Sequence, residues 1–537
     1  MPMEEEPPEM KEIFGPLAEA VSLAYRQGQE DETLEPHVLR DAQGAPMGRL
    51  RGGDAVIFFN IRGEREIELS RSLTEKDFQP FPVTKDLTLR FATLVEYTAD
   101  LNVPAAFPPP GTLPDTLGDV LSRLGIRQAR ITEAEKAFHV GFFLNGKKED
   151  PLPFEERIVV PTRKDVRLFD EAPEMSVAEV ADAVVEKIGD GDVRFIFANF
   201  ANVDVVGHIE NESAVLRAVE AVDTALGRAV AAARQTGMTV LVTADHGTVE
   251  KWLYEDGAVD TGHTESPVPF VLIDDAKGFS LRGRGELSDV APTVLQLLGI
   301  PQPEAMTGRT LIEALPAGFR PRRRLLLILL DGWGYSEEAR GNMIAKARTP
   351  AMDTLMNTCP RATLAAAGEA VGLPPGTVGN SEAGHLHIGA SRRVPSDRVR
   401  IEQAIADGSF FRNPVFLSVM REASAAGRAV HLMGIVSFFS SHGSIEHLFA
   451  LMEMAKREGV RNLFIHAMLG RRGELPESGA RYLSQIEERC RQLGIGRVVS
   501  VIGRYWSMDR EENWDRIEKT YRMLVEGEGI PVADERR

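Results

Sequence analysis

Residues 325–334 read LLLILLDGWG, six aliphatic residues followed by Asp331 and a glycine-rich turn. A short apolar run that ends in a turn is typical of a strand buried on both faces, as in a parallel sheet. Amphipathic segments alternate with further runs of this kind, and this alternation predicts an α/β fold. The strands that we predict are 55–59, 195–200, 240–243, 325–330, 430–436, 463–469 and 498–502.

Carboxylates, imidazoles and one hydroxyl follow several of these apolar runs. The ends of parallel strands are where open α/β sheets place their sites, so we expect these side chains to meet. Asp and His are ligands that Mn²⁺ and Zn²⁺ accept, and a bound metal can activate a serine hydroxyl as a nucleophile. The sequence therefore predicts one two-metal phosphoryl-transfer site, made of Asp204 and His208 (DVVGH), Asp245 and His246 (TADHG), His263 (GHT), Asp331 and Ser381 (GNSEAGH).

The composition is that of a soluble protein with more than one domain. A chain of 537 residues is too long for one ordinary core, so we expect two domains. The formal net charge of −18 disfavours a nucleic-acid partner. The first residues, MPMEEEPPEM, do not read as a signal peptide, and no apolar run approaches the ~18 residues of a membrane span. Cys359 and Cys490 are the only cysteines, so a disulfide framework is not expected and a reducing cytoplasm is the simplest compartment. Because no apolar run is long enough to span a membrane, we also expect the protein to bind no membrane.

Longer motifs surround the candidate site residues. They include NFANVDVVGH at 199–208, GNSEAGHLHIGA at 379–390, DAVIFFNIRGER at 54–65 and VIGRYWSMDR at 501–510. With these motifs the chain resembles the cofactor-independent, metal-dependent phosphoglycerate mutases of the alkaline phosphatase superfamily, over nearly its whole length beyond the first dozen residues. The resemblance implies an alkaline-phosphatase-like phosphatase domain with a second α/β transferase domain inserted in it.

The motifs stand in a different order from that of the family. The LDGWG strand opens the family's chain, whereas here it follows the TADHG and HTESPVPF segments. The C-terminal LVEGEGI reads as continuing into the N-terminal GPLAEAVSLAYRQG. We therefore predict a circular permutant whose former ends are joined through 316–324. On this basis the phosphatase domain spans 112–394, and the transferase domain is split between 1–108 and 396–537.

The resemblance also implies roles for the metal-site residues. One divalent ion would be held by Asp204, His208 and His263, and the other by Asp331, Ser381, Asp245 and His246. Mn²⁺ is the ion that we expect, with Mg²⁺, Co²⁺ or Zn²⁺ as alternatives. Ser381 would attack the phosphoryl group and form a phosphoserine intermediate, while the charge of Lys136, in the family's EAEK motif, would stabilise the leaving oxygen.

A second set of residues matches the family's substrate-binding positions. Arginine binds carboxylate and phosphate with a planar pair of donors, so a group of arginines on an acidic chain implies a small, doubly anionic phosphorylated carboxylate as the substrate. We expect the enzyme to act as a monomer in glycolysis. The substrate residues are Arg62, Arg65, His442, Arg472, Arg504 and Arg510.

Two segments depart from the family's pattern. The family's LDGRDTPP is LGRRGELP at 469–476, so the aspartate that should follow Arg472 is Gly473. In the family that carboxylate acts as an acid and base on the glycerate hydroxyls. The family's SDGGVHSH is SFFSSHGS at 437–444, which keeps His442 and introduces Phe438 and Phe439.

Three functions are therefore open at this point. The first is interconversion of 3-phosphoglycerate and 2-phosphoglycerate through phospho-Ser381. The second, favoured by Gly473, is a phosphatase or phosphotransferase that acts on a related phosphorylated or phosphonate carboxylate. The third is a binding or regulatory protein without turnover, which the complete set of metal ligands disfavours.

Overall fold

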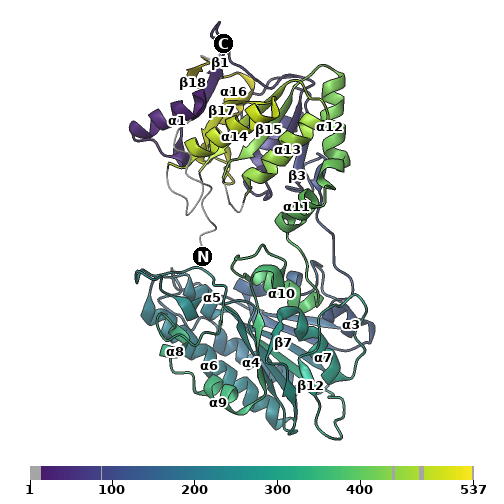
Figure 1. The fold of residues 1–537 in the computed structure, drawn as a ribbon. Coiled ribbons are helices and arrows are strands. Elements are labelled where there is room, and N and C mark those ends of the chain that lie inside the picture. The colour runs from purple at the N-terminus through teal and green to yellow at the C-terminus, as the bar shows by residue number, and fades with distance from the viewer. Residues whose placement is uncertain (1–13, 86, 438–441, 471–476, 535–537) are drawn as a thin grey trace. The chain divides into compact units, whose positions relative to one another are not determined.

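The computed structural model describes residues 14–85, 87–437, 442–470 and 477–534. The chain divides into two compact units (Figure 1). Pro110–Ser396 forms the first unit, and Met3–Pro109 together with Asp397–Arg537 forms the second. All seven predicted runs form strands, which confirms the α/β fold. Arg472, Gly473 and the aromatic pair Phe438 and Phe439 lie outside the described residues.

The sheet of the first unit has eight strands in the order β11-β14-β9-β8-β13-β7-β5-β6. β13 (Leu325–Leu330) lies parallel to β7 (Phe195–Phe200) on one side and to β8 (Thr239–Thr243) on the other. All six residues of β13 are buried, because helices cover both faces, and this explains why its sequence does not alternate. The other strands are β5 (Gln128–Glu133), β6 (Glu155–Val160), β9 (Val268–Ile273), β11 (Arg284–Glu286) and β14 (Arg361–Ala365), with β10 (Ser280–Leu281) and β12 (Ile312–Ala314) in a separate pair.

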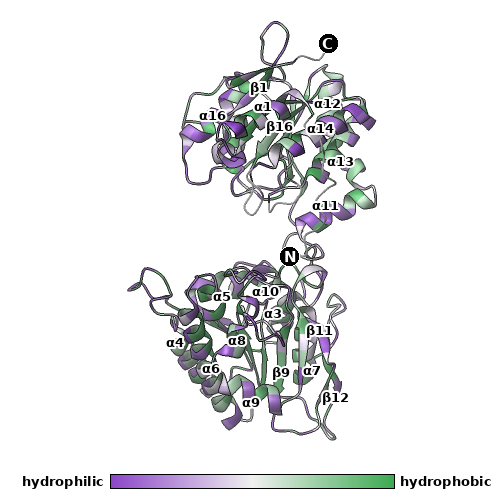
Figure 2. Ribbon diagram, turned by 60° about the vertical axis from the view of Figure 1, so that its left-hand side comes forward, coloured by the Kyte–Doolittle hydropathy of each residue, from purple (hydrophilic) through white to green (hydrophobic). Residues whose placement is uncertain are grey.

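Helices pack on both faces of this sheet. α4 (Val177–Gly189) and α6 (Glu212–Gln235) pack together on one face, and α7 (Val290–Leu298) lies on the other (Figures 1 and 2). Figure 2 shows the strands in the green of apolar residues, whereas the helices carry purple, polar residues on their outer sides. The remaining helices are α3 (Leu117–Arg123), α5 (Asn202–Gly207), α8 (Met343–Lys346), α9 (Pro350–Thr358) and α10 (Ser381–Ala390).

The sheet of the second unit is assembled from two distant parts of the sequence. Its order is β18-β1-β17-β16-β15-β2-β3-β4. β2 (Ala55–Phe58) lies between β3 (Arg90–Val95) and β15 (Val430–Ile435). β1 (His37–Arg40) lies between β17 (Arg497–Gly503) and β18 (Ile530–Ala533). Strands from both ends of the described chain are therefore hydrogen-bonded neighbours. The sheet is completed by β4 (Ala105–Phe107) and β16 (Leu463–Leu469).

The helices of the second unit are amphipathic and cover this sheet. α1 (Pro16–Arg26) packs on α14 (Gly479–Leu493), so here too the two ends of the chain share one core. Among the described residues, no helix has both the length and the apolar character needed to cross a membrane. The other helices are α2 (Ile67–Thr74), α11 (Asp397–Ala406), α12 (Pro414–Ala425), α13 (Ile445–Arg457), α15 (Arg504–Ser507) and α16 (Trp514–Val525).

His447 on α13 makes the second unit sensitive to acid. Its side chain is buried, and neither ring nitrogen has a hydrogen-bond partner among the described residues. Burial, and then the positive charge of Arg398, lower the pKa of His447 to about 3. The unfolded chain takes up this proton below its ordinary pKa of ~6.5 while the folded chain does not, so stability is lost as the pH falls.

We expect His447→Leu to remove this part of the acid sensitivity. Between pH 7 and pH 5 the wild-type protein should lose about 2 kcal/mol more unfolding free energy than the variant. Urea denaturation at the two pH values measures this difference. Equal losses in the two proteins would show that His447 is already protonated, or solvated, in the folded state.

Candidate metal centre

The ends of three adjacent parallel strands bring most of the candidate ligands together. Asp331 follows β13, Asp245 and His246 follow β8, and Asp204 lies on α5, which begins just after β7. The backbone N–H of Asp204 donates to the carbonyl oxygen of Asp331 at 3.1 Å, which joins two of these strand ends. Gly332 makes this approach possible: its φ is 79°, and a Cβ there would lie 2.7 Å from the backbone nitrogen of Asp204.

Ser381 is the first residue of α10, and its hydroxyl is directed into the same cluster. The cap of this helix is Asn380, whose side-chain oxygen accepts a hydrogen bond from the N–H of Ala383 at 2.8 Å. Ser381 is therefore not needed as a cap. Its Oγ donates to Asp331 Oδ1 at 3.2 Å and lies 3.0 Å from His246 Nε2. Gly384, one turn on, lets α10 pack against Asp245, since a Cβ there would lie 2.6 Å from the Cβ of Asp245.

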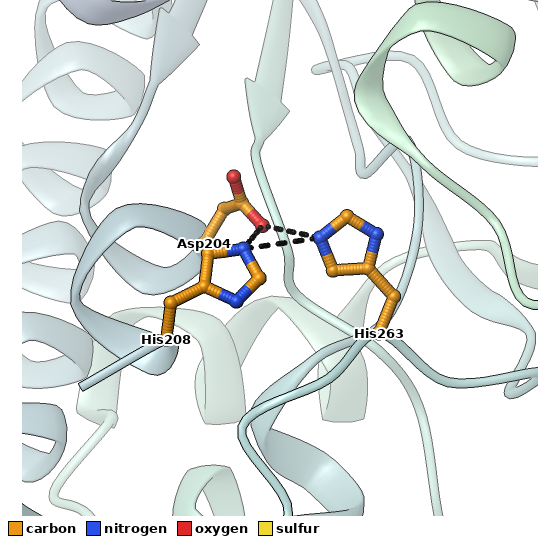
Figure 3. Close-up of side chains that lie close together, drawn as sticks. All are labelled: Asp204, His208 and His263. Carbon is orange, nitrogen blue, oxygen red and sulfur yellow. Dashed lines mark hydrogen bonds and ion pairs between the residues drawn. The ribbon is translucent and has the colours of Figure 1, made fainter. Parts of the chain in front are cut away.

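Asp204, His208 and His263 form one compact group (Figure 3). The Nε2 atoms of His263 and His208 lie 3.0 and 3.3 Å from Asp204 Oδ1, and 3.2 Å from each other. The opposite nitrogens are fixed by backbone carbonyls: Nδ1 of His208 donates to Thr261 at 2.7 Å, and Nδ1 of His263 donates to Gly379 at 2.8 Å. In the neutral rings, both Nε2 lone pairs then face a carboxylate oxygen.

Asp204 Oδ1 and the Nε2 lone pairs of His208 and His263 are three acceptors that converge on one point. A positive charge at that point would be stabilised by all three. Asp204 raises the pKa of His208 because it would accept a hydrogen bond from the protonated ring, and this shows the same attraction for a cation. Metal-binding histidines usually donate their other ring N–H to a carbonyl group or a carboxylate, which fixes the orientation of the ring. The group therefore has the donor chemistry and the tautomers of a metal site.

Asp331, Asp245, His246 and Ser381 form the neighbouring group. His246 Nε2 lies 3.6 Å from Asp331 Oδ1, 3.7 Å from Asp245 Oδ2 and 3.6 Å from Asp204 Oδ1. Asp204 thus faces both groups. The structure brings all seven predicted residues into one cluster, and the carboxylates of Asp331 and Asp245 are wholly buried.

Lys136 lies at the centre of the cluster. Its Nζ donates to Asp204 Oδ2 and Asp331 Oδ1, both at 2.6 Å, and to Ser381 Oγ at 2.7 Å. Burial would lower the pKa of Lys136, but the charges of Asp331 and Asp204 outweigh it and the pKa is raised. The side chain is therefore an ammonium ion in contact with the candidate nucleophile.

Sequence reasoning missed Asn199, which orients two members of the cluster. Its Nδ2 donates to Asp331 Oδ2 at 2.7 Å and lies 3.1 Å from His385 Nε2. His385 Nδ1 lies 2.8 Å from the carbonyl oxygen of Ser381 and donates to it. Both nitrogens of His385 are thus engaged, which argues against His385 as a metal ligand although it lies close to Asp245 and Asp331. The indication that the sequence gives for Asn199 is that it is the one polar residue in the otherwise apolar run FIFANF at 195–200.

The charges of the cluster fit divalent cations. Three buried carboxylates face one ammonium ion, and Asp204 Oδ1 and Asp245 Oδ2 are buried oxygens that accept no hydrogen bond from the described residues. Burial and the charge of Asp245 raise the pKa of Asp331, a sign of excess negative charge. Uncompensated buried charge is costly, and binding of metal ions removes it.

The predicted substrate residues lie in the second unit, and four of them are close together. Glu64 pairs with Arg62 at 3.3 Å and with Arg510 at 3.1 Å. Burial, and then the charges of Arg510 and Arg504, lower the pKa of Arg65. Arg65 also donates to the backbone oxygen of Met508 at 3.2 Å. The result is a concentration of positive charge that suits an anionic ligand.

His442 lies beside this group of arginines. Its carbonyl oxygen accepts a hydrogen bond from the N–H of Ile61, next to Arg62, at 2.7 Å. Its Nδ1 lies 3.0 Å from Oε1 of Glu66. Arg472, the remaining predicted substrate residue, lies outside the described residues.

Comparison with known proteins finds similar sequences and a similar structure. The chain is 45% identical over 302 residues to a 2,3-bisphosphoglycerate-independent phosphoglycerate mutase of Syntrophotalea carbinolica, covering 56% of this chain and 58% of that protein. It is 44% identical over 298 residues to a protein of the same name from Moorella thermoacetica, covering 55% and 57%. The chain thus spans about half the length of the curated relatives it matches. A crystal structure of Leishmania mexicana phosphoglycerate mutase at low cobalt concentration matches with 30% identity and a TM-score of 0.38, covering 51% of this chain and 53% of that one.

Two protein families account for most of the sequence. Residues 8–302 match the family described as Metalloenzyme superfamily. Residues 401–536 match the family described as BPG-independent PGAM N-terminus. The first match covers more than half of the chain and includes five of the seven clustered residues. The chain therefore belongs to the Metalloenzyme superfamily, and its residues 401–536 are similar to the BPG-independent PGAM N-terminus family.

Proposed function

We propose that this protein is a phosphoglycerate mutase that interconverts 3-phosphoglycerate and 2-phosphoglycerate through phospho-Ser381. The observation that carries the proposal is the position of Ser381 Oγ, within 3.2 Å of Lys136 Nζ, His246 Nε2 and Asp331 Oδ1. A hydroxyl in contact with an ammonium ion and a histidine, inside a metal-type cluster, is placed to act as a nucleophile. The names of the relatives support the substrate.

The cluster would hold two divalent ions, with Mn²⁺ as the expected metal. Asp204, His208 and His263 would hold one ion, and Asp331, Asp245, His246 and Ser381 the other. Bound ions would supply positive charge that favours the serine alkoxide and neutralises phosphoryl oxygens.

Side chains of the protein carry out the attack on phosphorus, the stabilisation of charge and the binding of the substrate. Ser381 Oγ forms a bond to phosphorus as the bond from phosphorus to the substrate oxygen breaks. The ammonium group of Lys136, already 2.7 Å from Ser381 Oγ, stabilises negative charge on the oxygens around the transferring group. In the second half of the reaction the phosphoryl group moves from Ser381 to the other glycerate hydroxyl. The arginines Arg62, Arg65, Arg504, Arg510 and Arg472, with His442, would bind the doubly anionic substrate.

We also propose that the chain is a circular permutant of this family. Its phosphatase domain would be 112–394, and its transferase domain 1–108 with 396–537. Two observations support this order. The segment that matches an N-terminus family lies at 401–536, after the metalloenzyme segment. The strands β1 and β18, near the two ends of the chain, are paired in parallel. A cytoplasmic location and a monomeric state stay predictions.

The test is an assay of both products with controlled metal content. Protein freed of metal with a chelator and reloaded with Mn²⁺ should convert 3-phosphoglycerate into 2-phosphoglycerate without releasing phosphate, and the chelated protein should be inactive. Calorimetric titration should show two ions per chain, and Asp204→Asn should weaken binding of both. Asp256→Asn, at an exposed carboxylate, is the matched control. Release of phosphate alone would favour the alternative, a phosphatase acting on a related phosphorylated or phosphonate carboxylate.

A further inference from the structure

A buried carboxylate that the proposed reaction has not yet used lies among the substrate residues. We propose that Glu66 and His442 form an acid–base dyad for the glycerate hydroxyls. This inference rests on the proposed function. It concerns proton transfer to and from the glycerate hydroxyls, for which the family uses the aspartate that is replaced by Gly473 in this sequence.

Glu66 is wholly buried and held from three sides. Its Oε1 accepts a hydrogen bond from Asn60 Nδ2 at 2.7 Å and lies 3.0 Å from Nδ1 of His442. Its Oε2 accepts from the backbone N–H of Arg65 at 3.0 Å. Asn60 is itself fixed, since its Oδ1 accepts from the N–H of Ile435 on β15 at 2.8 Å. The carboxylate is therefore rigidly oriented toward the imidazole ring.

The alternative explanations for this carboxylate are weaker. Glu66 stands at the N-cap position of α2, but its side chain makes no capping hydrogen bond to that helix. It forms no ion pair with an arginine among the described residues: Glu64 pairs with Arg62 and Arg510, and Glu66 acts on Arg65 through its charge alone. Its side-chain partners are an imidazole and an amide. A buried carboxylate on Nδ1 fixes the tautomer of a histidine and stabilises the imidazolium when the ring takes a proton.

The proton balance of the proposed reaction closes with this dyad. In the first half, the Ser381 alkoxide forms the bond to phosphorus, the phosphorus–glycerate bond breaks, and the leaving glycerate oxygen takes a proton from the His442 imidazolium. In the second half, the other glycerate hydroxyl gives its proton to His442 and forms the bond to phosphorus, and the phosphorus–Ser381 bond breaks to return the Ser381 alkoxide. Glu66 stays ionised throughout, and the dyad ends with the proton that it had at the start.

Glu66→Gln tests the proposal, because glutamine keeps the size of the side chain and one acceptor oxygen for Asn60 and His442 but removes the charge. In the Mn²⁺-loaded full chain we expect kcat for isomerisation to fall by about 10²–10³-fold, with KM changed less than about threefold. His442→Gln should lower kcat similarly, and the double variant should be no worse than either single variant. Glu66→Asp should recover part of the loss.

Glu68→Gln is the matched control. Glu68 is also a buried carboxylate on α2 and accepts a hydrogen bond from the backbone N–H of Glu512 at 3.0 Å, but no imidazole contacts it among the described residues. We expect its kcat to stay within about twofold of the wild type. Wild-type kcat in Glu66→Gln, or a loss confined to KM or to stability, would overturn the dyad while the mutase proposal stands. If Glu66→Gln does not fold, an unchanged kcat in His442→Gln overturns the dyad equally. A wild-type protein that forms no 2-phosphoglycerate would overturn both.

Discussion

Ser381→Ala should lower kcat for isomerisation by about 10⁴-fold or more, because among the described residues Ser381 carries the hydroxyl that contacts both Lys136 and Asp331 and would form the phosphorylated intermediate. The variant should fold normally, since the lost atom is one small hydroxyl and the helix cap is Asn380. It should still bind two divalent ions through the Asp and His side chains. Product analysis and calorimetry on the same metal-loaded sample measure both quantities.

Ser391→Ala is the control for this experiment. Ser391 ends the same helix, is buried, and donates a hydrogen bond to the backbone oxygen of Ser288 at 2.9 Å, away from the cluster. Its loss should change kcat by less than about threefold. If Ser381→Ala kept more than about one per cent of the wild-type kcat, another group would have to be the nucleophile, and the proposed mechanism would be wrong.

Lys136→Met should have the largest effect on stability. The ammonium group is 4% exposed and bonds to Asp204 and Asp331, so its removal leaves two buried carboxylates without their hydrogen-bonded cation. We expect the metal-free protein to lose about 3–5 kcal/mol of unfolding free energy. Divalent ions should restore much of this loss because they supply positive charge at the same carboxylates. Urea denaturation with Mn²⁺ and with chelator measures both values.

The same variant should also lose activity. Because Lys136 contacts the nucleophile, we expect kcat to fall by about 10²–10³-fold even with metal bound. Lys148→Met is the control, since Lys148 bonds to Asp119 at 2.7 Å, apart from the cluster and with greater exposure. Equal stability of Lys136→Met and wild-type protein without metal would contradict the charge compensation that we infer.

The sequence was sufficient to predict the fold class and to group most of the cluster. Parallel strands run in one direction, so residues that follow β7, β8 and β13 must meet at one edge of the sheet. This geometry explains why the sequence alone predicts that Asp204, Asp245 and Asp331 lie together. The unbroken apolar run of β13 likewise marked a strand covered on both faces.

Other features depend on contacts that a sequence does not display. Asn199 bonds to Asp331 from a strand 132 positions away, and a lone amide in a buried strand does not reveal which distant carboxylate it contacts. The tautomers of His208 and His263 depend on carbonyl groups that distant loops place against the rings. The sequence does not mark Glu66, since a glutamate beside arginines is usually a solvated ion pair, and its burial and its contact with His442 distinguish it.

The interleaved sheet of the second unit constrains the order in which a ribosome-bound chain can fold. Pro110–Ser396 is continuous and has its own core, so it can fold as soon as its last residue is made. β2 and β1 are synthesised early, but their partners β15 and β17 follow more than 370 positions later. Until then these apolar strands keep unpaired edges, which favour association with other chains. Pulse-chase proteolysis of nascent chains should therefore find residues 14–109 protected only after synthesis is nearly complete.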